Sequence, residues 1–140
     1  MFRLHPALRA ASIAIGRLGL SEVRLQRDRR FAWIVLVPRV AGAAALEDLT
    51  EADRIGLLGE VAAAGRAVRV MGEALSRPVE RLNIGVLGNI VPQLHVHVVG
   101  RRRDDPAWPG PVWGAGEAEA YGAPDLRRAL RAARASLASG

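Results

Sequence analysis

Two histidines of this chain are separated by one residue, in a segment that alternates polar and apolar side chains. Gln93, His95 and His97 occupy every second position, and Leu or Val stands between and after them. Because neighbouring side chains of a β-strand point to opposite faces, these three polar residues are expected to share one face. The two imidazoles would then lie roughly 6–7 Å apart along the strand. The apolar face would anchor the strand in a core and hold both rings rigidly.

The residue types around these histidines suit phosphate chemistry. A neutral imidazole nitrogen can attack phosphorus, and the backbone amides of a loop can hold phosphate oxygens. Such a loop precedes the histidines, since residues 83–92 contain Asn83, Gly85, Gly88 and Asn89. The same four residues are also common in turns that bind nothing.

Metal binding is a second chemical interpretation of a His-x-His strand, because two such rings can ligate Zn²⁺. A zinc site needs at least a third protein ligand. His5 is the only other histidine, and the chain has no cysteine. Four acidic residues of the later chain are the remaining candidates, but nothing in their spacing points to a site.

The segment from Gln93 to Val99 resembles the signature of the histidine triad superfamily of nucleotide hydrolases and transferases. That signature alternates three histidines with apolar residues and follows an Asn- and Gly-rich loop. Residues 31–38 also resemble an apolar strand of the family that ends in proline, so the likeness spans roughly residues 20–101. Gln93 stands where the family has its first histidine. Trp33 is nearest to a position that often carries a fourth.

The resemblance implies roles for individual residues. His95 matches the family's nucleophile, which carries the nucleotidyl group covalently, and His97 matches a contact to the phosphate and leaving group. Asn83 and Asn89 match residues that bind phosphate or ribose. Gln93 can orient a phosphate oxygen by hydrogen bonding, but an amide cannot gain a proton near neutral pH.

The function implied is that of a nucleotide hydrolase or nucleotidyl transferase, acting on dinucleoside polyphosphates or nucleoside phosphoramidates without a metal or other cofactor. The implied ligand is a purine nucleotide or dinucleoside polyphosphate, and the implied assembly is a homodimer. The alternative is a nucleotide-binding module that kept the fold and lost turnover, which the changes at Gln93 and Trp33 would favour.

Length and composition predict one domain over residues 1–140, with a core at about 20–101 and a C-terminal loop and helix at 102–140. No apolar run is long enough to span a membrane, so a cytoplasmic protein without membrane contact is expected. The net charge is +6. Arginines 127, 128, 131 and 134 fall on what reads as the solvated face of a helix, so nucleic acid is not expected as the main partner.

The order of predicted elements gives an α+β fold with helices packed on one side of an antiparallel sheet. We expect a helix over residues 6–15 and strands over 21–26, 31–37, 82–87 and 93–101. A long helix is expected between Thr50 and Pro78 with Ile55 and Leu58 in its inward stripe, and a last helix from Pro124. The proline-rich loop 104–116 holds Trp108 and Trp113, which could stack a nucleobase or pack a small core of their own.

Overall fold

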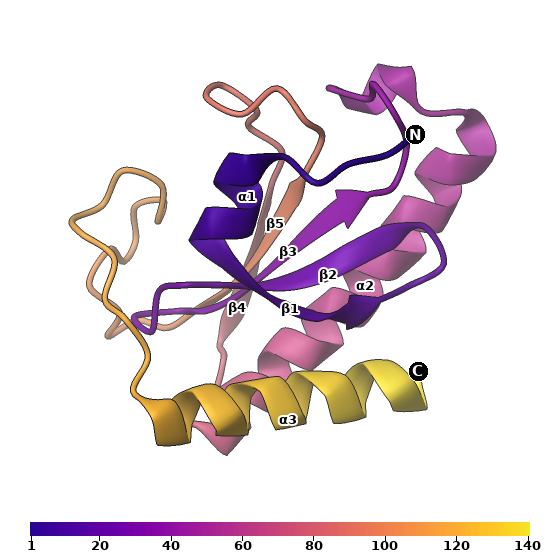
Figure 1. Cartoon of the computed structure of the whole chain (residues 1–140). Helices are drawn as coiled ribbons and strands as arrows, with labels where there is room; N and C mark the ends of the chain where they lie inside the picture. The colour runs from indigo at the N-terminus through magenta and orange to yellow at the C-terminus, as the bar shows by residue number, and fades with distance from the viewer.

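A computed structural model describes all residues of the chain, 1–140. Three helices and five strands follow the order α1 (Pro6–Ala11), β1 (Ser12–Arg17), β2 (Ser21–Gln26), β3 (Ala32–Pro38), α2 (Glu51–Ala74), β4 (Arg81–Gly85), β5 (Val96–Arg101) and α3 (Ala123–Ser139), with a short 3-10 helix at Leu46–Asp48 before α2. The result is the expected α+β class with an antiparallel sheet (Figure 1).

The sheet has the strand order β1-β2-β3-β5-β4, and every neighbouring pair is antiparallel. β3 is central and buried along its whole length, as its apolar sequence predicts. Its pairing with β5 sets Trp33 opposite Val99 and Val35 opposite His97. This register brings the two segments that carried the family resemblance side by side.

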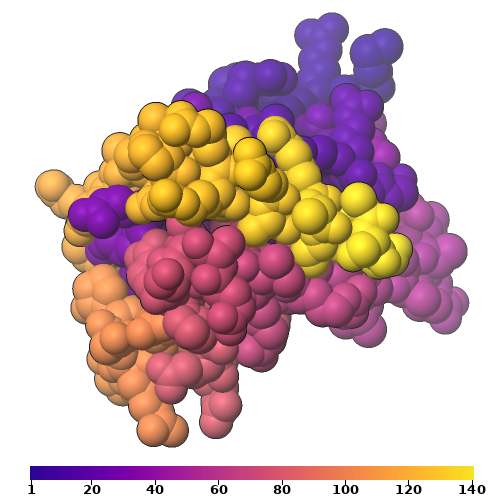
Figure 2. All heavy atoms as spheres, turned by 90° about the horizontal axis from the view of Figure 1, so that it is seen from below, coloured from indigo at the N-terminus to yellow at the C-terminus, as the bar shows by residue number.

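The two faces of the sheet are covered differently. The long helices α2 and α3 lie side by side over one face (Figure 2). They enclose the larger apolar core, which includes Leu25, Ile34, Met71 and Val98. On the other face, Leu8 of α1 and Val112 of the long C-terminal loop pack on the sheet in a second, smaller core. The helices on one side are therefore α2 and α3, and the opposite face carries the short α1 together with loops.

The first helix is shorter than the sequence predicted. It ends at Ala11, and the next six residues form strand β1, although residues 12–15 had been expected to continue the helix. Isoleucines at 13 and 15 favour a strand because their branched Cβ crowds a helix. Pairing with β2 then stabilises it: Ser12 Oγ donates to the Leu8 carbonyl at the junction and accepts a hydrogen bond from Arg24 Nε.

Helix α2 begins as predicted, with the Thr50 hydroxyl accepting a hydrogen bond from the Asp53 backbone N–H. The predicted inward stripe was wrong in the first two turns, where Ile55 is 67% and Leu58 is 72% exposed and Leu57 is buried instead. The last strand is also shorter than expected, since β5 starts at Val96 and His95 directly precedes it. No helix of the structure is both long and apolar enough to cross a lipid bilayer.

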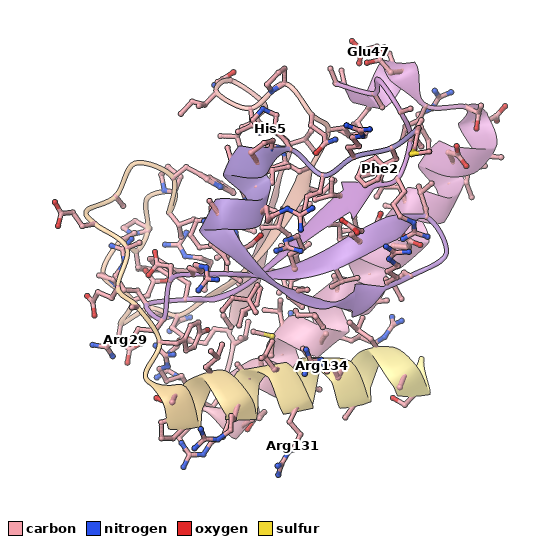
Figure 3. The ribbon with its side chains drawn as sticks, viewed as in Figure 1. Phe2, His5, Arg29, Glu47, Arg131 and Arg134 are labelled. Carbon is pink, nitrogen blue, oxygen red and sulfur yellow. The ribbon has the colours of Figure 1, made fainter.

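The arginines of α3 do not all face solvent. Arg134 reaches toward the sheet and donates to the Ile15 carbonyl oxygen at 2.9 Å, whereas Arg131 points away from the molecule (Figure 3). Arg134 therefore ties the last helix to the edge strand β1, a role that the repeat of arginines could not reveal.

Candidate active site

A cavity of about 540 Å³ lies on the face of the sheet that carries α1 and the loops. Strands β3 and β5 form its floor, and α1, the β4–β5 loop and residues 112–118 form its walls. The side chains that bring polar or ring nitrogen groups to it are those of Gln26, Asp28, Arg30, Trp33, Asn89, His95, His97 and Trp113. Both histidines of the predicted pair therefore line one cavity.

His95 is held by a hydrogen bond to its own loop. Its Nδ1 lies 2.7 Å from the backbone oxygen of Gln93, and the side chain is largely buried. Because a carbonyl oxygen can only accept, this contact places the ring proton on Nδ1. The other ring nitrogen, Nε2, keeps its lone pair, which is the state that a nucleophilic imidazole requires.

His97 has the opposite tautomer. Trp33 Nε1–H, which can only donate, lies 3.0 Å from His97 Nδ1, so this nitrogen accepts and the proton is on Nε2. Burial, and secondly the nearby charge of His95, lower the pKa of His97 from 6.5 to about 4. The two imidazoles lie with their centroids 5.0 Å apart. The cavity thus holds one ring nitrogen that accepts beside one that donates.

The other predicted binding residues are divided between the cavity and its supports. Asn89 lines the cavity, in a loop where Gly88 adopts a positive φ of 65°. Asn83 does not line it, because its Oδ1 accepts a hydrogen bond from Arg101 Nη1 at 2.8 Å. Gln93 is also outside the lining.

Gln93 instead holds the N-terminal segment. Its Oε1 accepts from the backbone N–H of His5, and its Nε2 donates to the backbone oxygen of Arg3, each at 2.8 Å. The residues that follow form α1, which contributes Ala7 and Ala11 to the cavity wall. Gln93 therefore fixes a wall of the cavity through two backbone contacts.

An ion pair at the cavity was not predicted from the sequence. Asp28 and Arg30 both line it, with Arg30 Nη2 2.8 Å from Asp28 Oδ2, and Arg30 Nη1 also donates to the Ala115 carbonyl. The side chain of Asp28 is buried. In the sequence Asp28 and Arg30 fall between the strands expected at 21–26 and 31–37, and no spacing linked them to the histidines. The sheet and the C-terminal loop bring them together with the histidines.

Only one of the two tryptophans of the C-terminal loop lies at the cavity. Trp113 lines the cavity, and its ring centroid is 5.5 Å from that of His97. It packs against Gly85 so closely that a Cβ there would lie 2.7 Å from the indole. Trp108 does not line the cavity, but its ring faces the Arg101 guanidinium at 5.6 Å.

The buried Arg101 anchors the loop that carries Trp113. Its Nε donates to Asp105 Oδ2 at 2.8 Å, and both side chains are almost fully buried. The rings of Phe31 and Trp108 lie near its guanidinium. A buried ion pair with these contacts fixes the path of the chain after β5, and so the wall that residues 112–118 form.

The structure holds no group of three or more His, Cys, Asp or Glu side chains that could bind a metal ion together. A metal at His95 and His97 would therefore lack a third ligand of these types.

The chain is similar to a protein family and to several solved structures. The family model described as HIT domain matches residues 8–104. The histidine triad protein of Bradyrhizobium japonicum is 38% identical, with 97% of this chain and 98% of that chain covered and a TM-score of 0.91. The histidine triad protein of Sinorhizobium meliloti is 41% identical, with 97% of each chain covered and a TM-score of 0.88. That of Marinobacter aquaeolei is 34% identical, with 99% of this chain and 98% of that chain covered and a TM-score of 0.89. No curated protein sequence matches significantly.

The sequence motif, the matched family model and the solved structures point to one assignment. The family model covers most of the chain, including the loop and both histidines of the cavity. The chain therefore belongs to the histidine triad family, whose members are in general nucleotide hydrolases and transferases.

Proposed function

We propose that the protein cleaves nucleotide phosphates through a covalent nucleotidyl-His95. Nε2 of His95 would attack the α-phosphorus, an N–P bond would form, and the bond from phosphorus to the leaving group would break. Water, or another acceptor, would then take the nucleotidyl group and release the neutral imidazole. The observation that carries the proposal is the contact of His95 Nδ1 with the Gln93 carbonyl, which leaves Nε2 free of a proton.

The groups around His95 suit a phosphate. His97 Nε2–H can donate to a phosphate oxygen, and the Asn89 amide and the Arg30 guanidinium line the same cavity. Asn83 and Gln93 would act indirectly, through Arg101 and through the N-terminal segment. The cavity volume lies in the range of small-ligand sites. A purine nucleotide or dinucleoside polyphosphate is the proposed ligand, and a nucleoside phosphoramidate is the other substrate class considered.

We further propose a homodimer and a cytoplasmic location. Strand β4 is an edge of the sheet with unpaired backbone groups, and Ile84 on it is 47% exposed. The exposed Ile55 and Leu58 of α2 add apolar surface that a second copy could cover. Sedimentation equilibrium at micromolar concentration tests the dimer, and a monomer would contradict it.

The test of the covalent mechanism is a His95→Ala variant analysed by mass spectrometry after incubation with diadenosine polyphosphate. The wild type is expected to gain the mass of one adenylyl group, and His95→Ala to gain none and release no AMP. His5→Ala is the matched control, because His5 does not line the cavity, and it should keep the adduct. Binding of AMP by calorimetry without an adduct in the wild type would instead favour a nucleotide-binding module.

A further inference from the structure

Trp33 determines what His97 can do with its proton. The indole N–H donates to His97 Nδ1 at 3.0 Å, and Trp33 is 6% exposed. Phe31 and Trp113 both contact it edge-on, with ring centroids 6.2 Å and 6.5 Å away. These contacts hold the indole in place, so His97 cannot exchange its partner by a rotation of Trp33.

A proton on His97 Nε2 can be shared in a hydrogen bond but not given away. If it left, the ring would become an imidazolate unless Nδ1 gained a proton from Trp33, and an indole N–H does not ionise near neutral pH. If His97 first took a second proton, it would have to bind at Nδ1, where the Trp33 N–H already points. Burial and the charge of His95 independently lower the pKa of His97 to about 4.

No other group at the cavity replaces the missing acid. The charged side chains that line it are Asp28 and Arg30, which are paired with each other. The remaining proton of His95 is on Nδ1, at the Gln93 carbonyl. The Gln93 amide is bound to the backbone of residues 3 and 5. A leaving group therefore finds hydrogen-bond donors here but no group that transfers a proton.

We infer that the site selects substrates whose leaving group departs as a stable oxyanion, as a nucleoside polyphosphate does, and rejects phosphoramidates of alkyl amines. The inference rests on the proposed function. In the favoured reaction the P–O bond breaks and its electron pair stays on the departing phosphate oxygen, which needs no proton. Cleavage of the P–N bond of an alkyl amine would leave its pair on nitrogen, and that nitrogen must gain a proton as it departs.

The first experiment compares three substrates of the wild type that share one adenylyl group. They are adenosine 5′-phosphate 4-nitrophenyl ester, diadenosine tetraphosphate and the n-butylamine phosphoramidate of AMP, and kcat/KM is measured for each. Because a positioned acid contributes on the order of 10²-fold or more, the phosphoramidate is expected to react at least about 100-fold more slowly than the other two. Rates within about threefold of one another, a margin far below that acid contribution, would overturn the inference.

The nitrophenyl ester separates failure of this inference from failure of the proposed function. Its leaving group needs no acid, so it should form nucleotidyl-His95 in any active site that uses His95. If no adduct forms from this ester, the covalent mechanism is wrong and the inference falls with it. If adducts form equally fast from all three substrates, the covalent mechanism stands and the inference is wrong.

Two variants of Trp33 test its part in the selection. Trp33→His offers Nδ1 of His97 a partner that can carry a proton. Trp33→Phe removes the N–H and leaves Nδ1 free to be protonated. The ratio of ester to phosphoramidate kcat/KM is expected to fall at least about tenfold in Trp33→His, a fraction of a fully positioned acid's effect. In Trp33→Phe the same ratio is expected to fall as the pH is lowered from 7 to 5.5, because His97 Nδ1 can then be protonated.

A purely structural role of Trp33 would slow both substrates and leave this ratio and its pH profile unchanged, which would count against the inference. The ratio is taken within each variant, so a partial loss of folded protein cancels. If neither variant folds, the wild-type substrate series still decides.

Discussion

Lowering the pH from 7 to 5 is expected to destabilise the folded protein through His97. In the fold, burial and the nearby charge of His95 lower the pKa of this ring to about 4, whereas in the unfolded chain it is 6.5. Between these two values the unfolded chain binds more protons than the folded one. The free energy of unfolding therefore falls as the pH falls through this window, and His97 causes no change above it.

The size of the effect follows from the two pKa values. The full window corresponds to about 3 kcal/mol, because one pKa unit is about 1.4 kcal/mol. At pH 5 the folded ring is still mostly neutral while the unfolded ring is mostly charged, so about 2 kcal/mol of this is already lost. For a domain with a stability of roughly 5–15 kcal/mol, such a loss is easily measured.

The assay is urea unfolding at pH 7 and pH 5 for the wild type and for His97→Gln, which can still accept a hydrogen bond from Trp33 but cannot titrate. The two proteins differ only at residue 97, so the difference between their losses reports on the protonation of this ring. The wild type should lose about 2 kcal/mol more than the variant between the two pH values. Equal losses would refute the view that His97 is held neutral by its surroundings.

Three further changes test the supports of the cavity. Gln93→Ala should lower the free energy of unfolding by about 1–3 kcal/mol, because two contacts to the backbone are lost, and should speed amide hydrogen exchange in residues 5–11. The control Asn89→Ala, in an exposed loop, should change the free energy of unfolding by less than about 0.5 kcal/mol. Equal effects of the two variants would contradict the role of Gln93 in holding the N-terminal segment. Asp105→Ala leaves the buried Arg101 without its carboxylate and should lower the free energy of unfolding by about 3–5 kcal/mol in urea titrations, whereas Asp104→Ala, in an exposed pair, should cost under about 1 kcal/mol. Gly85→Ala should lower the free energy of unfolding by about 1–3 kcal/mol and change the fluorescence of Trp113, because the new Cβ would collide with the indole. Gly59→Ala, where a Cβ has open space, is the control. An unchanged spectrum in Gly85→Ala would refute the close packing.

The elements that follow from local sequence were predicted well. Strand β2 has the predicted bounds, and α2 starts at the predicted cap because Thr50 and the acidic first turn act over a few residues. The failures arise where distant segments decide. Residues 12–15 formed a strand because β2 was available to pair with them, and Ile55 is exposed because the core meets the other side of α2. Neither outcome can be derived from a window of neighbouring residues.

The site shows the same division. The alternation of residues 93–97 correctly predicted that the two imidazoles lie close together, because their separation depends only on a short extended segment. It could not reveal that Asp28 and Arg30 join them, because this depends on the sheet and on the C-terminal loop. Nor could it show the partners of Gln93, which lie 88 and 90 positions away in the chain.

The two departures from the family's histidine pattern, Gln93 and Trp33, both form hydrogen bonds through groups that do not titrate near neutral pH. Gln93 offers an acceptor and a donor on one planar amide, and these match a backbone N–H and a backbone oxygen two residues apart. Trp33 offers a single donor that never ionises, and it meets the one ring nitrogen that must accept for His97 to donate at the other. Both replacements exchange groups that titrate near neutral pH for groups with a fixed hydrogen-bonding sense. On the proposed mechanism, such a site keeps His97 neutral, as a donor to the phosphate, from about pH 5 upward, and it depends on the substrate for a leaving group that needs no proton.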